Sequence, residues 1–410
     1  MAFQTYTLPN GLRIIHVPTT SPVTYCGFAI NAGTRDERAE QQGMAHFVEH
    51  NIFKGTKRRR AWHILNRMEN VGGNLDAFTG KEETIVYIDC LKAHFSRAAE
   101  LLSDIVFHST FPQAEIDKEV EVIIDEIQSY EDNPAELIYD DIESMLFKNH
   151  PLGRNILGKP EVLRNFRTTD ALAFTNRFYL PGNTVFFVQG NHDFKRIVHT
   201  MEKLTAELEK ANFTYRRTAI PRYQPQQLIL QKNTRQAHVM IGCRGYEARS
   251  RKQSALYLLN NILGGPGMNS RLNVSLRERR GLVYTVESNV SSYTDTGVFS
   301  IYFGCDPKDV QLCIELTQKE LRLLRENLLT PAQLSAAKKQ LIGQLGVASD
   351  HFENNALEMG KIFLHYNRYD EPEAIYARIH ALTAEELREV AHEKFCEDDF
   401  SLLIYAETEG

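Results

Sequence analysis

The sequence has little that would point to a disulfide framework, a membrane span or a nucleic-acid partner. Its six cysteines, at positions 26, 90, 243, 305, 313 and 396, are scattered and form no C-x-x-C pair. We expect them to be buried thiols in a reducing compartment. No stretch is long and apolar enough to span a bilayer. For that reason no membrane is expected as a partner, and the formal net charge of −6 gives no sign of a nucleic-acid partner. The basic run at 57–60 is expected to be an exposed loop, and contact of that loop with a polyanion is the alternative.

The first residues also lack the features of a targeting segment. The stretch MAFQTYTLPNGLRIIHV has no basic region followed by an apolar core, as a secretory signal would. Nor does it form the long amphipathic helix, rich in arginine and serine, that is expected of a transit peptide. Together with the reduced thiols, these absences predict a cytoplasmic protein.

The most informative stretch that is present is His46-Phe47-Val48-Glu49-His50. On a helix, His46 and His50 lie one turn apart on one face, where both imidazoles can reach one metal ion. Glu49 is then close enough to act as a general base on a water at that metal, which is metalloprotease chemistry. The order H-x-x-E-H is the inverzincin pattern. A chance pair of histidines on a solvated helix face is the alternative.

A zinc enzyme needs a third protein ligand, and residues 112–133 offer two candidates. Apolar residues recur there at helical spacing after Pro112, which suits the first turn of a helix. Glu119 and Glu126 are separated by two turns and so lie on the same side of that helix. The alternative for either glutamate is a solvated helix face, since this helix carries several other acidic residues.

With these residues the sequence resembles a known family, the pitrilysin-type zinc peptidases, also called M16. Its relatives include insulin-degrading enzymes and the short two-domain subunits of mitochondrial processing peptidases. The family signature is H-x-x-E-H followed by a distant glutamate, and Glu126 stands 76 residues after His50. Four longer segments also match the family: GMAHFVEHNIFKGT at 43–56, VGGNLDAFTGKEETIVY at 71–87, HPLGRNILG at 150–158 and FYLPGNTVFFVQGN at 178–191. The similarity covers nearly the whole chain.

The resemblance implies a role for each of these residues. His46, His50 and Glu126 would hold one Zn²⁺ per chain, and Glu49 would take the proton of the attacking water and pass it to the leaving amine. Glu119, one heptad before Glu126, would support catalysis by positioning a ligand or the water.

A diverged internal repeat organises the chain. In each half two strands precede a helix, a strand pair and two helices follow, and a helix-then-strand unit closes the half. Aligning Pro112 with Pro331 places Glu119 opposite Lys338 and Glu126 opposite Leu345, so the second copy has lost the zinc ligands. We expect an α+β fold of two homologous domains, each an antiparallel-rich sheet packed with helices. The polar segment 212–226 predicts the boundary, giving domains 1–215 and 216–410.

The second half is expected to contribute to the substrate site. Arg277 and Tyr284 match an arginine and a tyrosine through which the family's second domain reaches the substrate. Tyr284 would donate a hydrogen bond to the oxyanion, and Arg277 would contact a substrate carbonyl or support that tyrosine. A surface arginine and a core tyrosine are the alternative. The glycines at 264–267 match no nucleotide-binding motif, so a flexible loop that handles substrate is expected.

Residues 74–80, NLDAFTG, look like the family's edge strand, to which an extended peptide can add by main-chain hydrogen bonds. The family often has asparagine where this chain has Asp76, which leaves any role of that side chain open. Backbone pairing would survive the difference.

The implied function is zinc-dependent endopeptidase activity on peptides or extended polypeptide segments inside a closed chamber. Longer family members enclose that chamber with four domains. This chain has two, so it would need a second copy or a related subunit. A homodimer is somewhat favoured over a heterodimer, because one chain carries both the zinc motif and the Arg277/Tyr284 pair. Two alternatives stay open: a non-catalytic or partner-dependent subunit of a processing-peptidase-like complex, and a zinc hydrolase of non-peptide substrates.

Overall fold

The computed structural model describes residues 3–210, 215–232 and 234–407. The chain forms two compact units, each assembled from three separate stretches. The first unit contains Met1–Ile127, Arg154–Thr218 and Ser349–Glu371. The second unit contains Gln128–Gly153, Ala219–Ala348 and Pro372–Gly410. Both units therefore combine residues from the two halves of the sequence.

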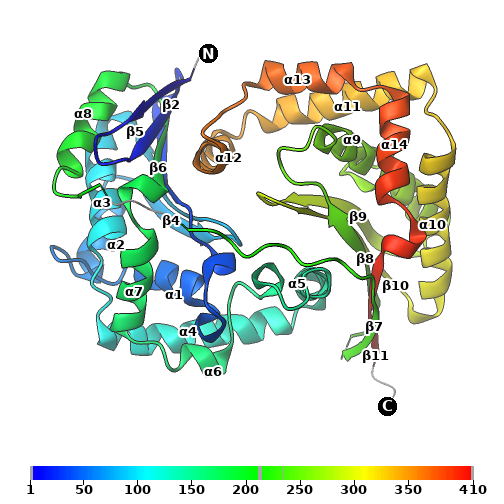
Figure 1. Cartoon of the computed structure of the whole chain (residues 1–410), viewed down its shortest axis with the longest axis horizontal. Helices are drawn as coiled ribbons and strands as arrows, with labels where there is room; N and C mark the ends of the chain where they lie inside the picture. The colour runs from blue at the N-terminus through cyan, green and yellow to red at the C-terminus, as the bar shows by residue number, and fades with distance from the viewer. Residues whose placement is uncertain (1–2, 211–214, 233, 408–410) are drawn as a thin grey trace. The chain divides into compact units, whose positions relative to one another are not determined.

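The first unit is built on a six-stranded sheet in the order β1-β2-β6-β3-β5-β4. Figure 1 labels β2, β4, β5 and β6 of this sheet. Strands β2 and β6 are parallel, and the other neighbours are antiparallel. In β3, β5 and β6 the side chains of both faces are almost all buried, and they alternate between these faces with the period of two of a strand. The strands are β1 (Gln4–Thr7), β2 (Arg13–Pro18), β3 (Val23–Ile30), β4 (Asn74–Thr79), β5 (Thr84–Leu91) and β6 (Thr184–Gly190).

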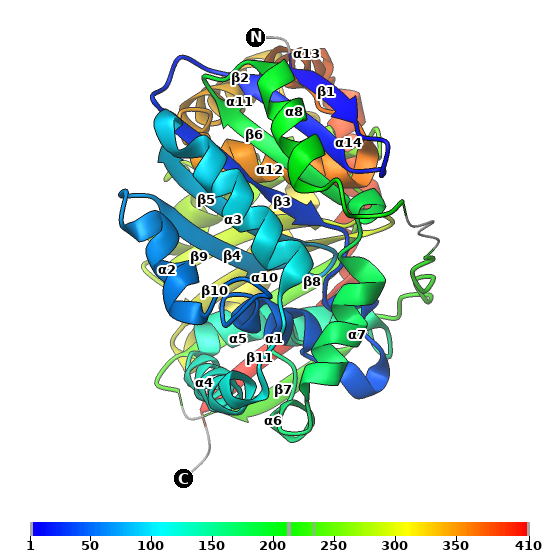
Figure 2. The ribbon, with the colours of Figure 1, turned by 90° about the vertical axis from the view of Figure 1, so that its left-hand side faces the viewer.

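Helices cover both faces of this sheet. On one face α3 packs against β3 and β5, with α2 and α8 beside it (Figure 2). On the other face α12 packs against β3 and β6. The helices are α1 (Met44–Asn51), α2 (Ala61–Glu69), α3 (Phe95–His108), α4 (Gln113–Glu131), α6 (Pro160–Leu163), α7 (Thr168–Phe178), α8 (Phe194–Leu204) and α12 (Phe352–Tyr366). The last residues of α4 belong to the second unit.

The second unit repeats this plan. Its five-stranded sheet has the order β7-β11-β8-β10-β9, which is the order of the first sheet without β1. The parallel pair β7 and β11 corresponds to β2 and β6. The strands are β7 (Gln227–Lys232), β8 (Ala237–Gly245), β9 (Val283–Ser292), β10 (Gly297–Cys305) and β11 (Ser401–Glu407). The predicted α+β fold with a diverged internal repeat is therefore confirmed.

The second sheet is also covered by helices on both faces. One face packs on α9 and α14, α10 contacts α14 and shares their core cluster, and the other face packs on α5. The helices are α5 (Pro134–Leu146), α9 (Gln253–Gly264), α10 (Val310–Glu326), α11 (Pro331–Ala348), α13 (Pro372–Ala381) and α14 (Ala384–Lys394). A short π-helical turn, Asn273–Glu278, precedes β9.

Each half of the sequence contributes one helix to the unit that is built mainly from the other half. Helix α5 comes from the first half but packs on β8 and β11 of the second unit, while α12 comes from the second half and packs on the first sheet. Each helix buries its apolar side on the sheet, for example through Met359 and Phe363 of α12, which lie with Phe187 of β6 in one core cluster. Gly360 allows this close contact, because a Cβ there would lie 2.5 Å from the Phe187 ring.

Several elements were not predicted from the sequence, namely strand β1 and helices α2, α5, α6, α8, α12 and α13. The predicted division at residues 215 and 216 stays a prediction, and residues 212–214 of the predicted boundary lie outside the described residues.

The expectation that residues 57–60 form an exposed loop is partly wrong. The Arg59 side chain is only 16% exposed, because it pairs with Glu100 at 2.6 Å and Asp104 at 2.5 Å. Among the described helices, none has the length and apolar character needed to cross a bilayer.

Candidate metal centre and its surroundings

Helix α1 places the two motif histidines side by side. The helix follows Gly43, whose φ of 92° lies in the left-handed region. The Glu37 carboxylate accepts hydrogen bonds from the first amides of the helix, at 2.9 Å from Gly43 N and 2.8 Å from Ala45 N. The His46 and His50 ring centroids are then 4.5 Å apart. The predicted helix and its one-turn spacing are both present.

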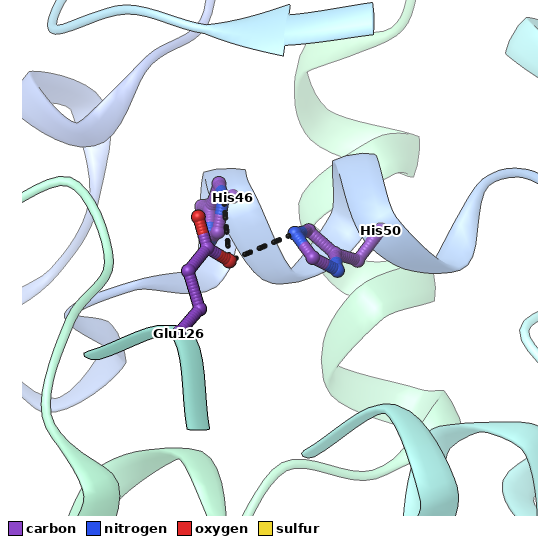
Figure 3. A group of neighbouring side chains, drawn as sticks. All are labelled: His46, His50 and Glu126. Atoms are coloured by element: carbon purple, nitrogen blue, oxygen red, sulfur yellow. Dashed lines mark ion pairs between the residues drawn. The ribbon is translucent and has the colours of Figure 1, made fainter. Parts of the chain in front are cut away.

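Glu126 of α4 faces both imidazoles (Figure 3). Its Oε2 lies 3.3 Å from His50 Nε2 and 3.8 Å from His46 Nε2. One potential ligand atom from each residue lies within 4.8 Å of the other two, which makes these three residues a possible metal site. Tetrahedral zinc, bound at ~2.1 Å, holds its ligand atoms about 3.4 Å apart. The donor types and their separations therefore fit Zn²⁺.

The state of His46 also fits a metal ligand. Its buried Nδ1 has no hydrogen-bond partner among the described residues, and the Glu126 oxygen is too far from its Nε2 for a hydrogen bond. Burial, reinforced by the neighbouring His50, lowers the pKa of His46 to about 3. The imidazole is therefore neutral at pH 7 and keeps a lone pair for a cation.

Glu119 orients the second imidazole. Its Oε1 lies 2.9 Å from His50 Nδ1, and its Oε2 lies 2.6 Å from Lys54 Nζ. A proton on Nδ1 donates to Glu119 and leaves Nε2 free for a metal. Burial alone would lower the pKa of His50, but the Glu119 hydrogen bond and the nearby carboxylates outweigh burial and raise it. Burial opposes ionisation of Glu119, yet its bonds to His50 and Lys54 lower its pKa.

Glu49 lies on α1 beside the last residue of β4. Its Oε2 accepts a hydrogen bond of 2.6 Å from the Thr79 hydroxyl. Burial raises the pKa of Glu49, and the Thr79 hydrogen bond partly offsets that effect. A carboxylate whose pKa is raised toward neutrality is better matched to accept and return a proton.

Strand β4 forms the edge of the first sheet, as predicted. The side chains of Asn74, Asp76 and Phe78 are exposed. The Asp76 carboxylate accepts a 2.8 Å hydrogen bond from the Ala77 amide and lies 3.3 Å from the Tyr87 hydroxyl. The side chain that differs from the family pattern thus contacts the edge-strand backbone itself.

Arg277 and Tyr284 belong to the second unit. Arg277 lies in the π-helical turn and Tyr284 in β9, the edge strand of the second sheet. Both side chains are exposed, Tyr284 at 74%. The alternative of a tyrosine packed in the core is therefore wrong. Their roles toward a substrate stay predictions.

The second half keeps the architecture and lacks the ligands. Helix α9 occupies the place of α1, and its inward side is apolar at Leu256, Leu259 and Leu263. Within the described residues, His46, His50 and Glu126 form the only group of histidine, cysteine and acidic side chains placed to hold a metal.

Two residues of the site were not assigned from the sequence, Lys54 and Thr79. Lys54 follows His50 by four residues, a spacing that could have indicated its contact with the partner of His50. For Thr79 there was no local signal, because its contact with Glu49 joins residues 30 positions apart.

Comparisons with known proteins agree with this geometry. The family model described as "Insulinase (Peptidase family M16)" matches residues 13–160, and the model described as "Peptidase M16 inactive domain" matches residues 165–341. A Bacillus subtilis protein named "Uncharacterized zinc protease YmxG" is 34% identical over 96% of each chain. An "Uncharacterized zinc protease" of Rickettsia felis is 32% identical over 97% of this chain and 96% of its own.

Solved structures share the fold at lower identity. A peptidase M16 inactive domain from Pseudomonas fluorescens superposes with a TM-score of 0.92 at 19% identity, covering 100% of this chain and 99% of that one. A protease from Helicobacter pylori gives 0.89 at 21% identity, covering 99% of each.

Proposed function

The chain belongs to peptidase family M16, and we propose that it is a zinc-dependent endopeptidase acting on peptides and on unfolded, extended polypeptide segments. The observation that carries the proposal is the set His46, His50 and Glu126, with Glu49 on the same helix as the histidines. Zn²⁺ bound there, one per chain, would act as a Lewis acid and acidify water.

In this proposal, side chains and the backbone of the first unit transfer the proton, orient a metal ligand and bind the substrate. Glu49 accepts the proton of the attacking water and donates it to the leaving amine. Glu119 keeps His50 in the tautomer whose Nε2 faces Glu126. The exposed edge strand β4 binds an extended segment through main-chain hydrogen bonds, which favours peptides over non-peptide substrates.

The proposal also gives roles to two residues of the second unit. Tyr284 donates a hydrogen bond to the oxygen on which negative charge develops, and Arg277 contacts a substrate carbonyl or supports Tyr284. A second copy of the chain, or a related subunit, closes the chamber. A homodimer is favoured because one chain holds both sets of residues. The proposed location is the cytoplasm, in keeping with the six cysteines, all free thiols.

A digest of an unfolded protein tests the function. The purified, zinc-loaded chain is incubated with a denatured, alkylated protein and with the same protein in its folded form, and products are mapped by mass spectrometry. We expect internal cleavages in the unfolded substrate, few in the folded one, and none after chelation. Absence of cleavage by the zinc-loaded chain would favour the alternative, a non-catalytic or partner-dependent subunit.

Removing one hydroxyl tests the role of the second unit. The Tyr284→Phe variant should keep its zinc and its melting temperature, because the side chain is exposed. If the hydroxyl stabilises the oxyanion, kcat falls by about 10²-fold, roughly 2.7 kcal/mol of transition-state stabilisation. KM changes less, because the hydrogen bond strengthens only as charge develops. An unchanged kcat would remove Tyr284 from the catalytic residues.

A further inference from the structure

The hydrogen bond between Thr79 and Glu49 lies beside a hairpin turn that many other contacts hold in place. Thr79 ends β4, is 9% exposed, and pairs with Thr84 across the hairpin that joins β4 to β5. Its hydroxyl donates to Glu49 Oε2 at 2.6 Å. This bond fixes one carboxylate oxygen and leaves Oε1 as the atom available to a reacting proton.

The hairpin turn at residues 80–83 is held by backbone hydrogen bonds. Gly80 N donates to Glu83 O at 2.7 Å, which closes the turn. The amides of Thr34 and Arg35 donate to Gly80 O and Lys81 O at 3.3 and 2.8 Å. Gly33 permits this approach, because a Cβ there would lie 2.5 Å from Gly80 O. The backbone next to Thr79 is therefore fixed from outside the hairpin.

Buried charges fix the same turn through its side chains. Lys81, Glu82 and Glu83 are 8%, 4% and 4% exposed. Lys81 Nζ donates to Arg154 O at 2.6 Å. Glu82 pairs with Arg35 at 2.6 Å. A turn with three buried charged side chains in succession is costly unless each is paired.

The third charge connects the turn to helix α12. Glu83 pairs with Lys361 and His365, both at 2.9 Å. Burial alone would raise the pKa of Glu83, but His365 and Lys361 lower it to about 2. Glu83 is thus ionised at pH 7 and anchors the turn to a helix from the other half of the sequence.

We propose that Thr79 is a positioning residue for Glu49, and that the anchored turn at 80–83 is the support that holds its hydroxyl in place. The inference rests on the proposed function of Glu49 as the general base. A base must be held within a fraction of an ångström of its working position by groups that are themselves fixed. A buried threonine that serves only the stability of the hairpin is the competing account.

Two substitutions at one position separate these accounts. Thr79→Val removes the hydroxyl and keeps the shape, and Thr79→Ser keeps the hydroxyl. We expect kcat of Thr79→Val to fall about tenfold, as for loss of one hydrogen bond to a charged group. We expect KM to change less than about twofold, zinc content to stay the same, and Thr79→Ser to recover most of the lost kcat.

A matched control and a structural measurement complete the test. Thr56 is 8% exposed and its hydroxyl donates to Asp104 at 2.9 Å, so Thr56→Val should affect stability without changing kcat. Crystal structures of Thr79→Val and Thr79→Ser should show Glu49 displaced in the first and unmoved in the second. A Thr79→Val variant with Glu49 in its original place would overturn the proposal. This readout holds whether or not the chain hydrolyses peptides, so failure of the proposed function would be recognised separately.

Discussion

The Glu49→Gln variant will hydrolyse peptides about 10²- to 10⁴-fold more slowly than the wild type, because it loses the general base. It will keep its zinc, since Glu49 is not among the three residues grouped as possible ligands. The amide can still accept the 2.6 Å hydrogen bond from Thr79, so the fold and the position of the side chain should be preserved. Turnover of a quenched peptide and metal content are measured on one preparation.

The control for this variant is Glu40→Gln, which changes an exposed glutamate just before α1. It should hydrolyse peptides at the wild-type rate. Near-normal turnover by Glu49→Gln would contradict the assigned mechanism. Loss of zinc from that variant would instead mean that Glu49 contributes to metal binding.

The Glu126→Gln variant will lose zinc, because it replaces an anionic ligand by a neutral amide. Glu119→Gln should weaken zinc binding by only about 10- to 100-fold, as expected when an outer partner of a ligand is lost. Zinc affinity is measured by competition with a chelator of known strength. This comparison decides which of the two glutamates is the zinc ligand, a question that helical spacing alone left open.

An exposed glutamate on the same helix provides the control, because Glu121→Gln changes charge on α4 away from the cluster. It should bind zinc as the wild type does. If Glu119→Gln loses more zinc than Glu126→Gln, then Glu119 is the ligand and Glu126 the outer partner.

The parts of the site that were predictable lie within single helices. The spacing of His46 and His50 requires only that α1 be helical, and the spacing of Glu119 and Glu126 requires only that α4 be helical. Repetition of strand and helix patterns likewise predicted two related sheets. The resemblance implied only that Glu119 positions a ligand or the water; that the ligand is His50 comes from the structure, since no local rule joins residues on different helices.

The parts that were not predictable depend on tertiary contacts. Helix α12 was not predicted, and its apolar positions would not say which sheet it covers: it packs on the first sheet rather than on that of its own half. The contact of Thr79 with Glu49 depends on the register of β4 on β5 and on where α1 crosses β4. A one-residue shift in that register would turn Thr79 to the other face of the sheet.

Titration of zinc into the metal-free wild-type chain, followed by the rate of peptide hydrolysis, shows whether one zinc per chain makes this protein a peptidase. We expect no hydrolysis without metal and a rate that rises linearly until one zinc is bound per chain, then stays constant. Hydrolysis by the metal-free chain, or a fully zinc-loaded chain that cleaves no peptide, would contradict the proposed zinc-dependent peptidase activity.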